Sequence, residues 1–320
     1  MEILLHSCCG LDVHKDMIQA CVLVGDADET PTTYLESFGT MPDDLSELAQ
    51  WLKGHACERV AMESTGVYWE PIYNVLEDAG FRIDVVNARY MSNMPGRKTD
   101  VKDAQWIADL LRHGLLKPSY VPERNIRILR EFTRTYKTTS ENRARELLRV
   151  EKLLQQKGFK LSTVLSDISG TTGRRILEHL IAHGSISAQE VMSYAVGPLK
   201  HTDEEIALAV KGKLTVTERS LLKIELEGVD FLEKQLEALL VEIRKIALPY
   251  QVQMRLLQSI PGIGEVAAYE ILAETGADLS KFKTAEHLAS WAGLSPRNNQ
   301  SAGKKTQLGS CPETHISSAY

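Results

Sequence analysis

Four carboxylates stand at positions from which they could act together on one substrate. Asp12 lies in a first apolar run, Glu63 ends a second one, and Asp100 and Asp103 follow three residues apart. An i, i+3 spacing places Asp100 and Asp103 on one face of a helix. Converging carboxylates repel one another unless a cation neutralises them. We therefore expect these four residues to be catalytic and to bind metal.

The expected metal follows from the types of ligand. The carboxylates are not accompanied by a set of His and Cys ligands, so the sequence predicts a hard cation with oxygen ligands, Mg²⁺ or Mn²⁺. Two such ions about 3.5–4 Å apart can activate a nucleophile and stabilise a leaving oxygen at phosphorus. The alternative interpretation is that these are surface aspartates and a glutamate at the end of a strand, without a common role.

The first 120 residues have a pattern of elements that would bring the four carboxylates together. We expect three strands, then a helix, a strand, a helix, a strand and a helix. In order these are Leu11–Val13, Met17–Val24, Thr32–Phe38, Met41–Leu52, Arg59–Met62, Tyr68–Glu77, Arg82–Val86 and Asp103–Leu116. This order, opening with an antiparallel hairpin, is typical of a ribonuclease H-like α/β fold. In that fold the first strand and a parallel neighbour end side by side, beneath the last helix.

The remaining chain is predicted to be helical. Two long charged stretches, from Pro122 to about Lys157 and from about Thr217 to Ala247, carry apolar residues close to a/d spacing. They predict long helices whose apolar seams meet each other or a partner chain. We expect three domains: a catalytic domain at 1–120, a coiled-coil region at 121–250 and a small helical C-terminal domain at 251–320.

Charge is unevenly distributed along the chain, although the net charge is only −6. Residues 1–88 contain 16 Asp and Glu against four Lys and Arg, whereas residues 89–149 contain seven against 14. An acidic block followed by a basic one favours a carboxylate-rich centre beside a surface that binds a polyanion. The alternative is two solvated faces. The basic residues expected to contact DNA or RNA here are Arg97, Lys98, Arg127, Arg130, Arg134 and Lys137.

Composition excludes several other classes of protein. No run of about 18 apolar residues exists, so we expect no membrane span. Five cysteines without CxxC spacing fit a reducing compartment better than a disulfide or zinc framework. Neither a GxGxxG nor a GxxxxGK[ST] phosphate loop is present. We expect a cytoplasmic, nucleoid-associated protein.

A Pro-Gly-Ile-Gly turn within Ser259–Ala268 predicts a helix-hairpin-helix. In such a motif Gly262 and Gly264 expose backbone N–H groups that hold a phosphate without reading the nucleic-acid sequence. The alternative is an ordinary glycine-rich turn between two helices.

Ser301 lies among small residues, shortly before Lys304 and Lys305. These lysines could hold a phosphate against the serine hydroxyl. The residues alone favour an ordinary loop serine.

Together these segments resemble the transposases of the insertion sequence 110 family, close to its 1111 subgroup. Asp12, Glu63 and Asp100-x-x-Asp103 reproduce the family's DEDD tetrad in order. The similar segments are Gly10–Asp16, Met62–Gly66, Gly96–Leu116, Ser119–Pro122, Ile260–Gly264 and Leu288–Lys305.

The resemblance implies a RuvC-like catalytic domain, a coiled-coil insertion and a C-terminal transposase domain. It further implies a catalytic serine at Ser301, with Ser295 as the second choice. It also implies a homo-oligomer and a structured guide RNA that pairs with donor and target DNA. Family members usually continue past Lys305 with a basic segment and further helices. The tail from Thr306 to Tyr320 departs from this pattern and is interpreted as truncated or frameshifted.

Three functions stay open at this point. The first is a transposase that cuts and rejoins DNA at the element ends and the target, with Ser301 forming a transient covalent link. The second is a Holliday-junction-type nuclease that uses the carboxylates and water. The third is an inactive remnant that only binds nucleic acid. The first two differ in whether Ser301→Ala abolishes cleavage, and the third gives no Mg²⁺-dependent product.

Overall fold

The computed structural model describes residues 4–26, 30–64, 66–87, 100–294, 300–301 and 304–305, the side chains of 100–102, 300–301 and 304–305 excepted. The chain forms two compact units. One comprises residues 1–121 with 284–320, and the other comprises residues 122–283.

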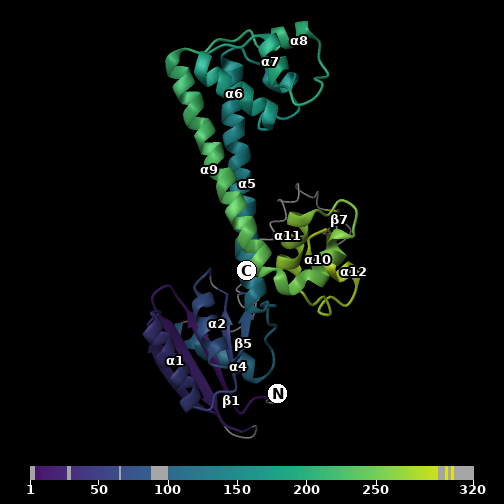
Figure 1. The fold of residues 1–320 in the computed structure, drawn as a ribbon. Helices are drawn as coiled ribbons and strands as arrows, with labels where there is room; N and C mark the ends of the chain where they lie inside the picture. The colour runs from purple at the N-terminus through teal and green to yellow at the C-terminus, as the bar shows by residue number, and fades with distance from the viewer. Residues whose placement is uncertain are drawn as a thin grey trace. The chain divides into compact units, whose positions relative to one another are not determined.

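A five-stranded sheet organises the N-terminal part of the first unit (Figure 1). The strand order is β3-β2-β1-β4-β5. The pairs β3–β2 and β2–β1 are antiparallel, and the pairs β1–β4 and β4–β5 are parallel. The strands are β1 Ser7–Val13, β2 Ile18–Val24, β3 Thr32–Phe38, β4 Arg59–Glu63 and β5 Arg82–Val86. This order and these directions are those of a ribonuclease H-like sheet, which confirms the α/β fold predicted for this region.

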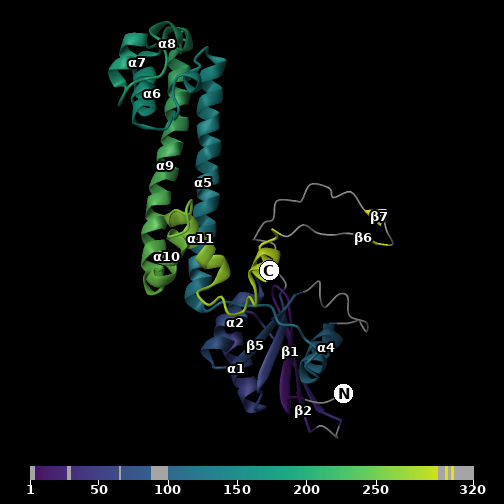
Figure 2. The ribbon, with the colours of Figure 1, turned by 90° about the vertical axis from the view of Figure 1, so that its right-hand side faces the viewer.

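Helices cover the two faces of the sheet differently. Helices α1 (Pro42–Gly54) and α2 (Trp69–Asp78) pack on one face over large aliphatic side chains such as Leu11 and Met62. Helix α4 (Asp100–Arg112) packs on the other face, where small residues such as Cys8 and Ala61 lie beneath it. Figure 2 shows α4 on the side of the sheet opposite to α1 and α2.

Two long antiparallel helices form the axis of the second unit. Helix α5 (Arg124–Gln156) and helix α9 (Val216–Ile246) lie side by side along their length, so the predicted seams meet each other. The two clusters of buried apolar side chains lie toward the ends of the hairpin, and Thr139 and Val229 are buried between them. Between Thr139 and Val150 of α5, and between Val229 and Ile243 of α9, no side chain is fully buried among these described residues.

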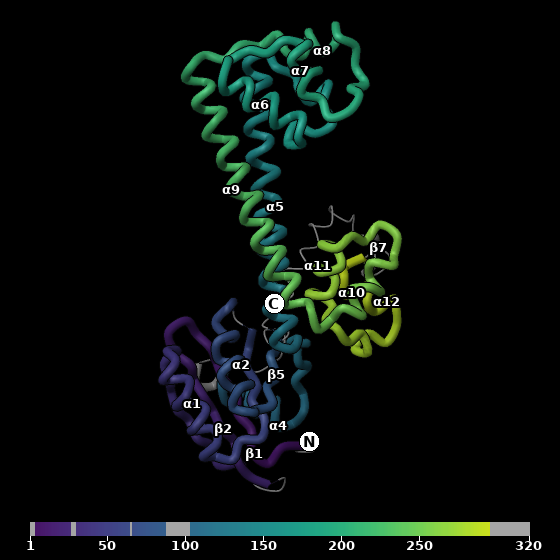
Figure 3. Tube along the Cα trace, viewed as in Figure 1, coloured from purple at the N-terminus to yellow at the C-terminus, as the bar shows by residue number. Residues whose placement is uncertain are grey.

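Short helices close the far end of this α5–α9 hairpin, and Figure 3 follows the chain through them. They share one core with the end of α5 and the start of α9, in which Phe159, Ile176 and Leu222 are fully buried. These elements are η1 Leu161–Thr163, α6 Thr171–His183, α7 Ala188–Tyr194 and α8 Asp203–Ala209.

The other end of the hairpin includes residues that the sequence had assigned to a separate C-terminal domain. Helices α10 (Gln251–Gln258) and α11 (Glu265–Thr275) share a core with the start of α5 and the end of α9, centred on Leu129, Ile243 and Leu272. The compact unit therefore extends to residue 283. The remaining elements are η2 Leu248–Tyr250, α12 Ala285–Trp291, β6 Gln300–Ser301 and β7 Lys304–Lys305. Among the helices described, none has the length and apolar character needed to span a membrane.

Candidate active site

Asp12 and Glu63 occupy neighbouring positions at the carboxyl ends of two paired strands. Strands β1 and β4 are parallel, and their register pairs Leu11 with Met62, one residue before each carboxylate. Leu11 and Met62 belong to the core beneath α1 and α2, whereas Ala61 lies beneath α4. Because successive side chains of a strand alternate between faces, Asp12 and Glu63 lie on the α4 face.

Helix α4 crosses β1 at Gly10 in backbone contact. A Cβ atom at Gly10 would lie 2.2 Å from the carbonyl oxygen of Ala104 and 2.4 Å from the nitrogen of Ala108. Two residues earlier, the Cys8 thiol donates to the carbonyl of Ala108 over 3.4 Å. Residues further along β1 therefore contact residues nearer the N-terminus of α4. The next residue on this face, Asp12, comes toward the first turn of the helix, which carries Asp100 and Asp103.

The donors at this edge of the sheet are carboxylate oxygens. Asp12, Glu63 and Asp103 are partly buried, and the side chain of Asp100 lies outside the described ones. Within the described side chains, no group of three or more His, Cys, Asp and Glu residues is close enough to hold a metal ion. The chemistry of the donors nevertheless suits a hard divalent cation rather than one bound by thiolates.

His14 contacts Asp12, and the sequence analysis did not single out this histidine. Its Nε2 atom lies 3.2 Å from Oδ2 of Asp12, whose side chain is only 14% exposed. The backbone N–H of His14 donates to the carbonyl of Met17 over 2.9 Å and closes the turn between β1 and β2. The i, i+2 spacing of Asp12 and His14 could have indicated this contact, because it places both side chains on one face of an extended segment.

Ser301 belongs to a two-residue strand, although the sequence predicted a loop. Strands β6 and β7 pair antiparallel, with Ser301 opposite Lys304 and Gln300 opposite Lys305. Three other predicted residues, Ser295, Arg97 and Lys98, lie outside the described residues.

The turn between α10 and α11 is open. Gly262 has a φ of +90°, and Gly264 is the N-cap residue of α11 with extended backbone. No described atom lies within 4 Å of a Cβ atom built at either glycine. The first turn of α11 also carries Glu265, which pairs with Arg244 over 2.7 Å.

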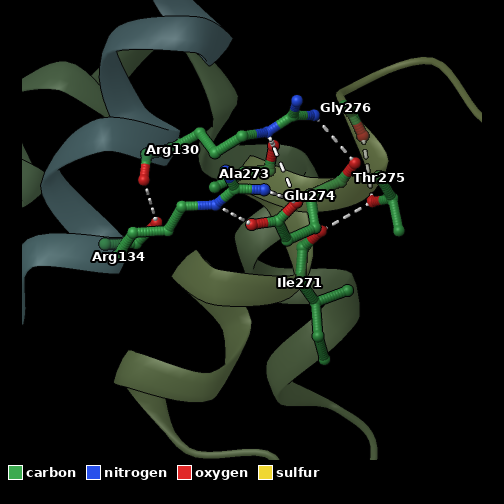
Figure 4. Close-up of polar contacts among 8 residues, drawn as sticks. Arg130, Arg134, Ile271, Ala273, Glu274, Thr275 and Gly276 are labelled. Carbon is green, nitrogen blue, oxygen red and sulfur yellow. Dashed lines mark hydrogen bonds and ion pairs between the residues drawn. The ribbon is translucent and has the colours of Figure 1, made fainter. Parts of the chain in front are cut away.

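The predicted basic face of α5 packs largely against α11. The Arg130 guanidinium donates from Nε to the carbonyl of Ala273 over 3.0 Å and from Nη2 to that of Glu274 over 3.1 Å. Arg134 forms two hydrogen bonds to the Glu274 carboxylate, at 2.8 and 3.1 Å. Figure 4 shows both arginines reaching the last turn of α11. Carbonyls at a helix C-terminus have no partners within their own helix, and a cation stabilises them.

The structure therefore corrects one part of the sequence prediction. Arg130 is 7% exposed and engaged within the unit, so its guanidinium does not line an accessible surface. Arg127 is half-buried and donates to the Pro122 carbonyl over 2.7 Å, whereas Lys137 is exposed. Charge and spacing alone could not distinguish these roles, because the partners of Arg130 lie more than 140 residues away in sequence.

Replacing Arg130 with Ala is expected to lower the free energy of unfolding of the second unit by about 3 kcal/mol. The substitution leaves the Ala273 carbonyl without this donor and removes a buried partner of Glu274. Urea unfolding followed by circular dichroism measures the effect, with the exposed Lys137→Ala as the matched control. An unchanged unfolding midpoint, with a shallower salt dependence of DNA binding, would instead assign Arg130 to phosphate contact.

The four described cysteines are core residues. Cys8, Cys9, Cys21 and Cys57 are buried free thiols. Burial raises the pKa of Cys8 and Cys57 to about 12 and that of Cys21 to about 11. Thiols that stay protonated at neutral pH are poor nucleophiles and metal ligands.

Family models match both ends of the chain. A model of DEDD transposases of the IS110 type matches residues 9–158, which include all four carboxylates. A second model, described as transposase of the IS116/IS110/IS902 family, matches residues 254–314, which include the α10–α11 turn and Ser301.

Whole-chain relatives and solved structures were also found. The pilin gene-inverting proteins of Moraxella lacunata and Moraxella bovis are each 22% identical over 322 aligned positions, covering 97% of this chain and 79% of the relative. Thermus thermophilus RuvC aligns with 35% of this chain and 99% of its own, at 15% identity and a TM-score of 0.27. The structure of T. thermophilus RuvC in complex with a Holliday junction substrate aligns with 36% of this chain and 100% of its own, at 13% identity and a TM-score of 0.27.

The two family models agree in their family and match the chain in the expected order, and the strand order independently gives a ribonuclease H-like fold. The chain therefore belongs to the IS110 family of transposases, enzymes of DNA recombination.

Proposed function

We propose that this chain moves an insertion sequence by cutting and rejoining DNA, with the carboxylate edge of the sheet and Ser301 as its two chemical centres. The observation that carries the proposal is the register of β1 with β4 beneath α4. It brings Asp12 and Glu63 side by side and directs Asp12 toward the first turn of α4. The pairing of these two strand ends supports a common role for Asp12 and Glu63.

Asp12, Glu63, Asp100 and Asp103 would hold a divalent cation, Mg²⁺ or Mn²⁺. When bound, the cation would polarise the phosphate and offset the charge that builds up as the phosphodiester is cleaved. The four carboxylates position it, and His14, 3.2 Å from Asp12, orients that carboxylate.

Ser301 is the proposed nucleophile. Its hydroxyl oxygen forms a bond to phosphorus while the bond from phosphorus to a deoxyribose oxygen breaks. The serine proton leaves to a base, and the departing oxygen takes up a proton. A serine hydroxyl is a weak nucleophile and needs such help. Lys304, opposite Ser301 in the β6–β7 pair, supports the proposal because its charge would attract the phosphate.

The remaining contacts are with nucleic acid and with further copies of the chain. The proposed partners of phosphates in DNA or guide RNA are Arg97, Lys98, Arg127, Arg134, Lys137, Lys304 and Lys305. The open turn at Gly262 and Gly264 is proposed as a helix-hairpin-helix contact to a phosphate. The chain is further proposed to assemble as a homo-oligomer.

Ser301→Ala tests the serine step against the nuclease that uses water. Labelled DNA carrying the element ends is incubated with Mg²⁺ and RNA transcribed from the flank of the element, and the products are separated by denaturing electrophoresis. We expect Ser301→Ala to abolish both strand exchange and the denaturation-resistant protein–DNA adduct, while DNA binding persists. Ser295→Ala is the matched control and should form the adduct.

Two outcomes would contradict the assignment. An adduct that persists in Ser301→Ala and is lost in Ser295→Ala would make Ser295 the nucleophile. Cleavage that persists in both variants without any adduct would favour the Holliday-junction-type nuclease, in which water attacks phosphorus.

A further inference from the structure

Two exposed hydrophobic side chains follow Glu63 after a short turn. Val67 is 69% exposed and Tyr68 is 41% exposed. Glu63 lies on the α4 face of the sheet, whereas helix α2, which begins at Trp69, packs on the opposite face. The chain between them therefore crosses the carboxyl edge of the sheet, where the carboxylates lie. Val67 and Tyr68 therefore follow the carboxyl end of β4, the edge of the sheet at which Glu63 lies.

The backbone on both sides of this pair is held firmly. Ser64 is buried, and its N–H donates to the carbonyl of Val86 at the end of β5 over 2.9 Å. On the other side, Trp69 is 3% exposed in the main core and meets the ring of Tyr73 edge-on, with centroids 5.7 Å apart. Buried residues thus flank Val67 and Tyr68 on both sides, at Ser64 and at Trp69.

The turn itself presents the tyrosine ring. Gly66 has a φ of +55°, a conformation that glycine adopts at little cost. A Cβ atom built at Gly66 would lie 3.7 Å from two ring carbons of Tyr68, so one edge of the ring faces Gly66. The N–H of Glu70 donates to the carbonyl of Val67 over 3.3 Å and starts the helical turn. Tyr68 remains accessible beside this turn.

We propose that Tyr68 stacks on a nucleobase beside the phosphate presented to Asp12 and Glu63, with Val67 packing against the neighbouring sugar or base. This inference rests on the proposed function, because it requires DNA at the carboxylate edge. Aromatic rings bind unpaired bases by stacking, which tolerates any sequence because every base has a π-face. A base must leave its stack for this contact, and an apolar side chain beside it favours that distortion.

Stacking makes a prediction that simple hydrophobic packing does not. Tyr68→Ala is expected to weaken equilibrium binding of element-end DNA about tenfold, within the range measured for loss of one stacked base. Tyr68→Phe keeps the ring and should bind like the unchanged protein. Tyr68→Leu keeps apolar surface without the ring and should lose most of the affinity.

An abasic residue in the DNA locates the base. Fluorescence anisotropy measures binding of labelled element-end DNA in which an abasic residue replaces, in turn, each nucleotide flanking the cleaved bond. At one position the unchanged protein should lose about tenfold in affinity, whereas Tyr68→Ala should lose nothing further. Tyr34→Ala, at an equally exposed tyrosine on β3, is the matched control and should respond to the abasic residue like the unchanged protein.

The outcomes separate this inference from the proposed function. Unchanged DNA affinity in Tyr68→Ala, or an equal loss on intact and abasic DNA, overturns the stacking contact and leaves Tyr68 as a site for a protein partner. Failure of the proposed function is seen independently, as cleavage that survives substitution of Asp12. Binding is measured without any cleavage step, so the two failures cannot be confused. Unfolding midpoints equal to that of the unchanged protein show that each variant is folded.

Discussion

Asp12→Asn is expected to lower the rate of DNA cleavage at least about a thousandfold while leaving the protein folded. The change preserves shape but removes a negative charge from the carboxylate edge, where Asp12 lies beside Glu63 at the ends of paired strands. A thousandfold loss corresponds to about 4 kcal/mol of transition-state stabilisation, a reasonable loss when a charged metal ligand becomes neutral. Single-turnover cleavage of labelled element-end DNA with Mg²⁺ measures it.

Stability provides a second readout for the same variant. Carboxylates that gather without a cation repel one another, so Asp12→Asn should unfold at the same temperature as the unchanged protein, or higher, when metal is absent. The control is Asp16→Asn, an exposed carboxylate in the turn after β1, which should alter neither cleavage nor stability. Full cleavage by Asp12→Asn would remove this residue from the active site.

Gly10→Ala is expected to destabilise the first unit by about 3 kcal/mol or more, although it adds a single methyl group. The new Cβ atom would meet the carbonyl oxygen of Ala104 at 2.2 Å and the nitrogen of Ala108 at 2.4 Å. Both atoms are backbone, so no rotamer change relieves the clash and the helix must move away from the strand. Because α4 also carries Asp103, cleavage should fall even in the molecules that remain folded.

Urea unfolding followed by circular dichroism measures the loss in Gly10→Ala. Gly54→Ala is the matched control in the same unit, because no described atom lies within 4 Å of a Cβ atom built there. Gly54 ends α1, so alanine should leave stability level or raise it by up to about 1 kcal/mol. Equal midpoints for Gly10→Ala and the unchanged protein would disprove the backbone contact between α4 and β1.

Much of the fold could be predicted because its elements have strong periodic patterns. The strand Thr32–Phe38 and the strand Arg82–Val86 occur with the predicted bounds, and the long helices begin and end within about two residues of their predicted limits. Apolar residues repeat over many positions in the long helices, and such repetition identifies both the element and its buried face. The strand order then places Asp12 beside Glu63.

Other parts of the structure left no periodic signal. The β6–β7 pair has two residues in each strand, too few for an alternating pattern to appear. The packing of α10 and α11 onto α5 depends on long-range contacts, such as the one from Arg130 to the end of α11, that spacing along the chain does not encode. Gly10 did carry a usable signal, since glycine inside a strand often marks close approach of another backbone.

The α5–α9 hairpin divides its stability between its two ends. The core around Phe159 and Leu222 and the core around Leu129 and Ile243 share no residue. The stretch between them is joined by the buried side chains of Thr139 and Val229 and by the ion pair from Arg143 to Glu233 at 2.6 Å. Proteins open locally in units that follow their buried contacts, and here each end of the hairpin has a core of its own. Damage at the α6–α8 end can therefore open that end by local unfolding, while the end that holds α11 keeps its native contacts.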